Sequence, residues 1–353
     1  MLKRISLCVT SSLVLACAPA AHAHIVDNVL EHSAPNAALQ LTPIGSHESG
    51  VLGKSAAEIV AYHAASQRVL TVNARSGEID ILDASDPTQP QKIGAISAGG
   101  DKEINSVAVR PDGLAVAAVQ QADKNDNGEA LFFNAATGQE LGRVGVGALP
   151  DNVHLTADGR HALVANEGEP SDALNAEGTA YLKDPEGSIS VISLPADVAA
   201  PALNDVHTAG FTAFDTADLD PSIRVFGPSE HHNLPSRDFE PEYISSADGK
   251  AYATLQENNA IAVIDIESAT VEQVIPAHMA DHSKVPLDPS NKDDVAELRT
   301  IPVKGLSMPD SIGAFEAGGQ TYFATANEGD AREWGGYTDE VELKDLVKDG
   351  KVC

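Results

Sequence analysis

The amino-acid sequence predicts an all-β fold built from small repeated sheets. Its 353 residues include 28 glycines and 20 prolines, and only 21% are charged, which suits short strands and tight turns better than long helices. Short apolar runs separated by Gly, Asp and Asn turns also recur along the chain in copies of about 45 residues, the length of one propeller blade. The sequence therefore predicts a β-propeller.

Two copies of the repeat show its plan. Asp151 opens one copy, which continues through an Ala-Asp-Gly turn at residues 157–159 into the strand-like HALVAN at 161–166. Glu242 opens the other, with the same turn at 247–249 followed by AYATLQ. Such runs are typical of antiparallel strands joined by hairpins. The scheme also starts at Glu58, Asn105 and Asp310, so we expect about five recognisable blades.

The N-terminal 23 residues have the features of an export signal. Lys3 and Arg4 precede an apolar stretch, which ends in a small-x-small cleavage pattern at residues 21–23. An alternative interpretation is a lipoprotein cleavage site before Cys17, which would then carry a lipid anchor. No later segment approaches the roughly 20 apolar residues of a membrane-spanning helix. We therefore expect a periplasmic, secreted or cell-surface protein without a transmembrane segment.

The remaining chain divides into a linker and one domain. We expect a linker at residues 24–36 and the propeller at residues 37–353. The alternating residues LQLTPIG within 37–53 predict an outer strand that joins the first and last blades. Two long gaps between copies predict inserts at 171–238 and 276–304.

The charge excludes one class of partner. Lys and Arg total 23 against 52 Asp and Glu, a formal net charge of -29. A chain this acidic repels phosphate backbones, so nucleic acid is not an expected partner.

Polar residues occupy the two repeat positions that meet at one rim of a propeller. In each blade the first strand begins and the second ends at the same rim. The openings are Glu58, Asn105, Asp151, Glu242 and Asp310, and the second strands end at Asn73, Gln120, Asn166, Gln256 and Asn327. Together these residues predict an acidic and amide-rich ring that favours cations or a hydroxyl-rich ligand. The alternative is that each one caps its own blade by hydrogen bonds to turns and strands.

Further carboxylates and one arginine belong to the same rim. Metal ligands are predicted at Glu167, Glu169, Glu257, Glu328 and Asp330, with Arg332 close by. A second candidate calcium site places oxygen ligands at Asp123, Asn125 and Asn127. There the twelfth position of the loop is Asn134 instead of Glu, so a turn rich in Asn and Asp is the alternative. Calcium is thus the expected cofactor, if there is one.

Standard catalytic motifs are missing from the sequence. It contains no GxSxG, Walker, HExxH or CxxC pattern. Nucleophilic catalysis by one of these motifs is therefore unsupported.

Eight motifs together resemble one family. They are VNARSGEIDILD (72–83), NSVAV (105–109), GALPDNV (147–153), NEGEPS (166–171), RVFGP (224–228), DFEPEYIS (238–245), LQENNAIAVID (255–265) and ANEGDAREW (326–334). The chain resembles the choice-of-anchor I family, exported bacterial propellers similar to the animal mesenchyme-specific cell surface glycoproteins. The resemblance implies a seven-bladed, WD40/YVTN-like propeller held at the cell surface by varied C-terminal anchors. Family members continue beyond the last of these motifs with further blades, so we expect the chain to be a fragment with about five of seven blades.

Two functions are compatible with these features. The first is an exported propeller that binds a small-molecule or cell-surface ligand through its acidic, loop-rich rim. The alternative is a calcium- or other metal-dependent phosphomonoesterase, since some members of the family carry the name alkaline phosphatase. In that case the predicted metal ligands would bridge the phosphoryl oxygens, and Arg332 would stabilise transition-state charge. A lactonase-type propeller enzyme shares the fold and is a third hypothesis.

Overall fold

The computed structural model describes residues 36–39, 41–51, 53–226, 234–290, 292–335 and 337–352. The predicted export signal, Cys17 and residues 24–35 of the linker lie outside the described residues. Both interpretations of the N-terminal segment therefore stay predictions.

Within the described residues, the fold consists mainly of four antiparallel sheets of four strands each. The strands of each sheet follow one another in chain order, as in a propeller blade. The sheets are β1 (Val60–His63), β2 (Arg68–Asn73), β3 (Glu78–Asp83) and β4 (Gln91–Ser97); β5 (Glu103–Val109), β6 (Leu114–Gln120), β7 (Asn127–Asn134) and β8 (Gln139–Ala148); β9 (Pro150–Leu155), β10 (His161–Asn166), β11 (Ser188–Ser193) and β12 (Val206–Gly210); and β13 (Pro241–Ala247), β14 (Lys250–Leu255), β15 (Ala260–Asp265) and β16 (Thr270–Pro276).

Smaller elements complete the chain. Three two-stranded sheets pair β17 (Met279–Asp281) with β18 (Lys304–Leu306), β19 (Pro309–Ala317) with β20 (Gln320–Asn327), and β21 (Glu333–Trp334) with β22 (Tyr337–Thr338). The helices are short: η1 (Ala64–Ser66), η2 (Leu203–Asp205), η3 (Thr212–Phe214), α1 (Pro235–Asp238) and α2 (Leu343–Lys348). None of the helices among the described residues has the length and hydrophobicity to span a bilayer. The all-β prediction is confirmed.

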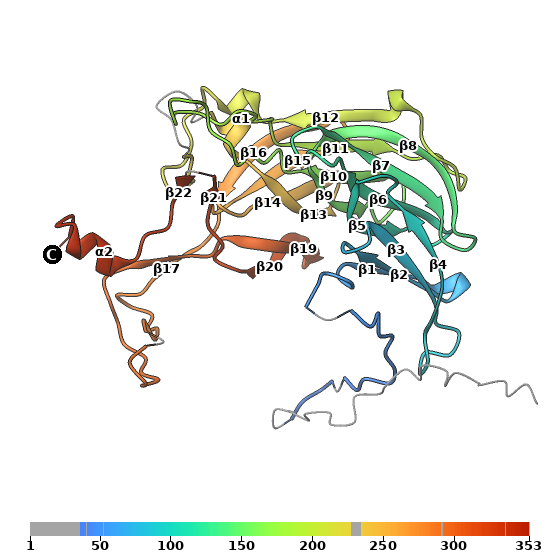
Figure 1. Ribbon diagram of the computed structural model, residues 1–353, viewed down its shortest axis with the longest axis horizontal. Coiled ribbons are helices and arrows are strands. Elements are labelled where there is room, and N and C mark those ends of the chain that lie inside the picture. The colour runs from blue at the N-terminus through green and yellow to red at the C-terminus, as the bar shows by residue number, and fades with distance from the viewer. Residues whose placement is uncertain are drawn as a thin grey trace, which may run out of the picture.

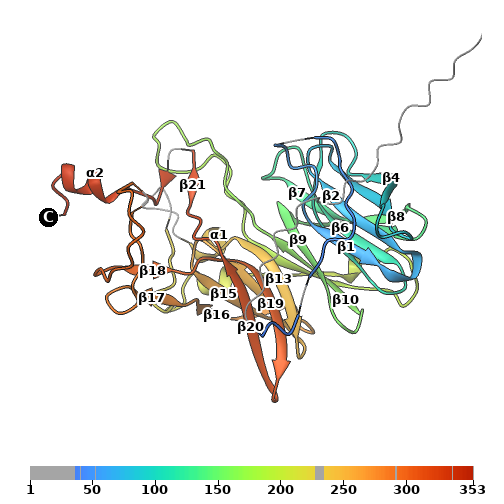
Figure 2. The ribbon, with the colours of Figure 1, turned by 90° about the horizontal axis from the view of Figure 1, so that it is seen from below.

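The sheets are arranged as a fan. The first strand of each sheet contacts the first strand of the next, in the order β1, β5, β9, β13 and β19. Figure 1 shows the sheets following one another around this line, and Figure 2 shows the same succession from below. The hairpin β19–β20 forms the fifth unit. The arrangement is propeller-like, and it brings the starts of the five inner strands to one end.

Each pair of neighbouring sheets encloses its own hydrophobic core. One buried cluster lies between β1–β4 and β5–β8, a second between β5–β8 and β9–β12, and a third between β9–β12 and β13–β16. Strand β6 shows why the apolar runs are continuous: Ala115 and Ala117 face one cluster, whereas Leu114 and Val116 face the next. Both faces of an inner sheet are covered, so both sets of alternate residues are apolar.

The two outermost units of the fan leave apolar side chains exposed. Val60 and Tyr62 on β1 are 62% and 54% exposed, and Phe315 and Tyr322 on the β19–β20 hairpin are 50% and 44% exposed. The inner sheets bury the equivalent faces. Residues 45–49 lie against part of the outer face of the first sheet but leave these side chains of β1 exposed.

Two details of the predicted organisation were wrong. Residues 37–53 form no strand among those that are described, and β4 supplies the outer strand of the first sheet through its own pairing with β3. The insert predicted at 171–238 was too wide, because it contains β11 and β12, which pair in register with β10 and complete the third sheet. The range 276–304 contains β17 and the first residue of β18, which pair with each other.

The inter-sheet cores should carry most of the stability. Leu163 is fully buried in the third cluster, whereas Leu182 is 64% exposed. Leu163→Ala should lower the free energy of unfolding by about 2–5 kcal/mol, because it removes buried surface and leaves a cavity. Leu182→Ala is the matched control and should change it by less than about 1 kcal/mol. Urea denaturation followed by circular dichroism measures both, and equal effects would contradict this assignment of the core.

Candidate functional site

The inner strands begin with a proline followed by an acid. Pro150, Pro241 and Pro309 are the first residues of β9, β13 and β19, and Asp151, Glu242 and Asp310 come next. Proline is tolerated at this position because it donates no ladder hydrogen bond. The register with the second strand shifts directly afterwards in all three strands. Such bulges redirect side chains at sheet ends, so the same local structure aims each acid out of the ladder.

Two loops add carboxylates at the same end. Glu167 and Glu169 flank Gly168 after β10, and Glu328 and Asp330 flank Gly329 after β20. Gly168 has a φ of +71°, and a Cβ there would come within 2.7 Å of the Glu186 main chain. Only glycine fits that turn, so the sequence Glu-Gly-acid fixes two acids on either side of a sharp bend.

The acids at this end of the sheets affect one another's ionisation. Burial raises the pKa of Asp151 to about 7, and Asp310, Glu169 and Glu58 add to the effect. Burial also raises the pKa of Glu167 well above its usual range, with further contributions led by Asp151. We call this group the acidic mouth. It consists of Glu58, Asp151, Glu167, Glu169, Glu240, Glu242, Glu257, Asp310, Glu328 and Asp330.

Glu242 is a half-buried acid of the mouth with a strongly raised pKa. Burial raises its pKa to about 10, followed by the charges of Glu257, Asp151 and Asp310. In the orientation that hydrogen bonding requires, the Gln256 amide donates to both Glu242 oxygens at 2.9 Å. Gln256 therefore orients Glu242 without neutralising it.

The other rim amides mostly tie strands together. Asn105 donates to Gln120 Oε1 at 2.9 Å and to the Pro150 carbonyl at 3.0 Å, which links β5, β6 and β9. Asn166 is fully buried, donates to Ser190 and accepts from the Gly147 N–H. These contacts are those of the capping alternative.

The remaining two amides lie in different surroundings. Asn73 is buried and donates to Asp80 at 3.4 Å, again within one sheet. Asn327 is exposed and accepts from the Thr325 hydroxyl at 3.0 Å.

Arg332 lies beneath the mouth and not on its open face. It is 2% exposed, and its guanidinium contacts Asp238 Oδ1 at 2.6 Å and Glu240 Oε1 at 3.2 Å. The Phe226 ring lies 4.9 Å from the guanidinium carbon. Asp238 also accepts from the Asn258 amide at 2.8 Å. The arginine predicted beside the rim is thus buried and ion-paired.

Asp238 and Glu240, the partners of Arg332, were not predicted from the sequence. A signal was available, since Asp238, Glu240 and Glu242 alternate just before and into β13. Such alternation places acids at regular intervals on an extended chain. That these acids point to an arginine 94 residues away depends on the loop after β20, which no local pattern encodes.

Lysines pair with two of the other predicted metal ligands, Glu169 and Asp123. Lys124 binds Glu169 at 2.5 Å and lies over the Trp334 ring, 4.2 Å from its centroid. Lys183 binds Asp123 at 2.6 Å and Asp126 at 3.1 Å. The turn at 123–128 is therefore held by a lysine. In the part of the chain that the structure describes, no three acid, histidine or cysteine side chains are grouped closely enough to hold a metal ion.

Several buried acceptors under the mouth have no hydrogen-bond partner among the described residues. They are Glu240 Oε2, Glu257 Oε2, Asn258 Oδ1 and Tyr181 Oη. Glu240, Glu257 and Asn258 are 1%, 7% and 0% exposed. Burial raises the pKa of Glu257 to about 7, while Arg332 opposes this rise. Unpartnered buried oxygens are unfavourable, so this region is suited to a ligand that supplies donors.

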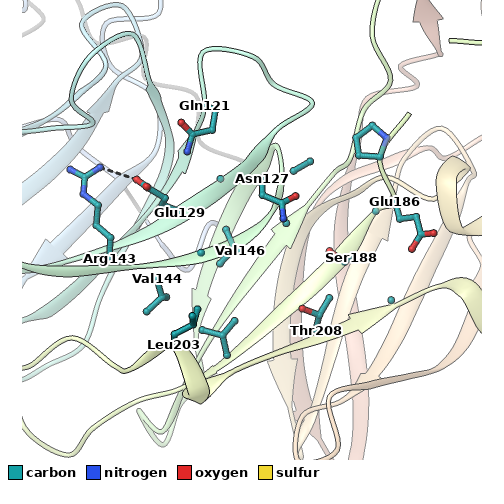
Figure 3. Close-up of a pocket in the computed structure, with 18 residues that line it drawn as sticks. Gln121, Asn127, Glu129, Arg143, Val144, Val146, Glu186, Ser188, Leu203 and Thr208 are labelled. Carbon is teal, nitrogen blue, oxygen red and sulfur yellow. Dashed lines mark hydrogen bonds and ion pairs between the residues drawn. The ribbon is translucent and has the colours of Figure 1, made fainter. Parts of the chain in front are cut away.

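A separate groove of about 900 Å³ lies between β7–β8 and β11–β12 (Figure 3). Its charged residues are largely paired, since Glu129 binds Arg143 at 3.2 Å and Lys102 at 2.8 Å. Of the predicted site residues, Asn127 lines it and the acids of the mouth do not. The groove has no group of unpaired charges comparable to the mouth.

Comparison with known proteins identifies a family model and distant structural matches. A model described as the choice-of-anchor I domain matches residues 58–352. A comparison with curated proteins finds no match. Similar solved structures include a nidogen/laminin complex (11% identity, TM-score 0.38, 64% of this chain and 66% of that chain) and Myxococcus xanthus glutaminyl cyclase (11%, 0.34, 77% and 87%). A third is Kuenenia stuttgartiensis hydrazine synthase (13%, 0.34, 63% and 74%).

The chain thus spans slightly less than two thirds of the nidogen/laminin chain. At these identities and TM-scores, nothing about function follows from the structural matches.

The buried Arg332 cluster should be a major source of stability. Arg332→Ala leaves Asp238 and Glu240 buried without their cation and should lower the free energy of unfolding by about 3–5 kcal/mol. The matched control is Arg299→Ala, because Arg299 is half exposed and 4.0 Å from Asp293. Its effect should stay below about 1 kcal/mol. Chemical denaturation measures both, and a small effect of both variants would contradict a structural role for the buried cluster.

The mouth should make the protein less stable as pH rises. In an unfolded chain Asp and Glu ionise near pH 4. In the folded protein, burial raises the pKa of Asp151 and Glu257 to about 7. Between these values the folded state holds more protons than the unfolded state, so the free energy of unfolding falls with increasing pH. Carboxyls with a lowered pKa, such as Asp281 beside Ser283, act only below pH 4.

Thermal unfolding between pH 5 and pH 8 checks this pH dependence. The melting temperature should decrease over the range, and Asp151→Asn combined with Glu257→Gln should flatten the decrease. Glu267→Gln removes an exposed acid at the opposite end of the sheets and should leave the slope unchanged. A melting temperature that rises from pH 5 to pH 8 would contradict the crowding of carboxyls at the mouth.

Proposed function

Because the chain belongs to the choice-of-anchor I family, we propose that it works outside the cytoplasm as a surface-associated binding protein that takes its ligand at the acidic mouth. The crowding of partly buried acids supports this proposal most directly. Asp151, Glu167 and Glu242 have raised pKa values chiefly because of burial, and each is further affected by its acidic neighbours. A cationic group of a ligand offsets both the burial cost and the mutual repulsion.

The lysine and arginine side chains near the mouth are already paired with carboxylates. Lys124 is paired with Glu169, and Arg332 is paired with Asp238 and Glu240. These pairs leave Asp151, Glu167, Glu242 and Asp310 without a cation of their own in the interactions that the structure describes. The carboxyls on the open side of the mouth therefore lack a counter-charge, and a bound cation would favour their ionised form, so we expect the ligand to bring the positive charge.

The proposed setting of this site is a closed ring. Further blades would cover the exposed apolar faces of β1 and of the β19–β20 hairpin, and seven blades in all would agree with the family resemblance. The N-terminal 23 residues would direct export, with Cys17 as the lipid attachment point in the alternative interpretation. A ring would complete the circle of carboxylates around one channel mouth.

Binding fits the described geometry better than phosphoryl transfer. A phosphomonoesterase needs a cation to hold the phosphoryl oxygens and a donor for the transition-state charge. Arg332, the predicted donor, is buried and engaged by two carboxylates. Calcium remains part of the proposal as a ligand of the mouth, where binding would draw carboxylates from several loops together.

Thermal shift with a panel of cations tests the proposed function. Calcium, magnesium and spermidine are added separately to the protein at pH 7.5 and constant ionic strength. At least one should raise the melting temperature, with saturation, because a ligand of the folded state stabilises it by mass action. Asp151→Asn combined with Glu242→Gln should abolish the rise, whereas Asp248→Asn combined with Glu267→Gln, at the opposite end of the sheets, should keep it.

Two outcomes would count against the proposal. An equal rise in both double variants would place binding elsewhere, and no rise with any cation would leave the mouth without a cationic ligand. Hydrolysis of a chromogenic phosphate ester that requires calcium and is lost in Glu167→Gln would instead support the phosphatase.

A further inference from the structure

The surroundings of the Arg332 guanidinium show which chemical groups this region can bind. Its guanidinium is held between Asp238 and Glu240, next to the Phe226 ring. The Asp238 carbonyl accepts a further hydrogen bond at 2.9 Å. Carboxylates, a carbonyl and an aromatic face together form a site for a flat organic cation with several N–H groups. In this structure the Arg332 guanidinium itself occupies that site.

The acceptors around this site outnumber the donors. Glu240 Oε2, Glu257 Oε2, Asn258 Oδ1 and Tyr181 Oη lack partners among the described residues. The unpartnered buried donors of the same region are Arg332 Nε, Trp334 Nε1 and the Tyr181 hydroxyl, which can donate as well as accept. An ammonium group supplies three donors and a guanidinium five, and neither needs a donor in return. An excess of buried acceptors therefore calls for a ligand group of this kind.

The unpartnered carboxylates are linked to the mouth through Gln256 and through their charges. Glu257 follows directly on Gln256, whose amide holds both oxygens of Glu242. Among the neighbouring charges, Glu257 has the largest effect on Glu242, and Glu240 acts on both Glu242 and Glu167. Glu240 and Glu257 therefore act electrostatically on the acids of the mouth, including Glu242 at the start of β13.

A bare metal ion fits this arrangement less well. Calcium needs six to eight oxygen ligands at 2.3–2.6 Å around one point. No three acidic, histidine or cysteine side chains in the described chain are grouped for that purpose. The oxygens are instead spread along a path from Glu240 past Glu257 to Glu242. An extended cation with several donors can reach them without bringing the loops together.

We propose that the mouth recognises a primary ammonium or guanidinium group of its ligand, seated next to Arg332 between Glu257, Glu240 and Glu242. This inference rests on the proposed function and narrows it to organic cations with N–H donors. The proposed ligand site offers carboxylate oxygens, with Asn258 and Tyr181 as further acceptors. A cation without N–H groups would leave those acceptors unpaired, so charge alone is not sufficient.

Isothermal titration calorimetry with four cations tests the proposal. Spermidine carries ammonium groups, L-arginine amide carries a guanidinium, tetramethylammonium has charge but no N–H donor, and calcium is a metal ion. Spermidine and L-arginine amide should bind the wild-type protein, and tetramethylammonium should not. Glu257→Gln should weaken their binding by about tenfold or more, since it removes a buried charge partner. The matched control Glu267→Gln should bind as the wild type does.

The melting temperature of the ligand-free Glu257→Gln variant is a second measurement, and it should not fall although ligand binding weakens. Glu257 is buried with one oxygen unpartnered, so its replacement by a neutral amide should keep or raise the melting temperature of the free protein. Weaker binding together with an unreduced melting temperature identifies a ligand contact and not a folding defect. A melting temperature that falls in the variant would show that Glu257 already has a stabilising partner, and would overturn the proposal.

The remaining outcomes separate this inference from the proposed function. Binding of calcium alone, lost in Glu257→Gln, would overturn the organic-cation inference but keep a ligand at the mouth. Equal binding of tetramethylammonium and spermidine would overturn the role of the N–H donors. If Glu257→Gln leaves spermidine binding unchanged, the proposed ligand position beside Glu257 is wrong. No binding of any cation would overturn both proposals.

Discussion

The structure depends on one constraint: acids at the same position of successive repeats must share a small space. The inner strands begin side by side, because β1, β5, β9, β13 and β19 contact one another in sequence. A carboxylate at the start of one strand therefore meets those of the next units. Burial and mutual repulsion raise the pKa values of Asp151 and Glu242. A repeat that places an acid once per blade thus raises carboxyl pKa values through contacts between blades, which no single blade could do alone.

Stability and binding place opposite demands on this end of the fan. The inter-sheet cores fix the inner strands, and the Arg332 cluster ties the loop after β20 to the start of β13. These contacts hold the carboxylates together despite their repulsion. The nearby cations, Lys124 and Arg332, are already paired with carboxylates, so the other acids of the mouth have no cationic partner among the described interactions. Functional sites often retain such unfavourable arrangements because a ligand relieves them.

The sequence predicted the parts of the site that the repeat encodes. The openings at Asp151, Glu242 and Asp310 could be located because a strand-like run and a glycine-containing turn follow each of them, and all three come after the first residue of an inner strand. The repeat does not encode the contacts that join different loops. The pairing of Arg332 with Asp238 spans 94 residues, and the pairing of Lys124 with Glu169 spans 45. The outer strand expected at 37–53 was also wrong, because alternation alone does not make a strand, and β4 forms the outer strand of the first sheet.

Direct titration of the side-chain carboxyls tests the shared space at the mouth. Carbon-13 NMR of protein labelled at Asp and Glu side-chain carboxyls, followed from pH 3 to pH 9, reports each ionisation. A distinct set of resonances should titrate at or above pH 6, and Asp151→Asn should remove one of them and shift others. Titration of all carboxyls near pH 4 would show that the acids of successive repeats lie apart in water, and would contradict the account.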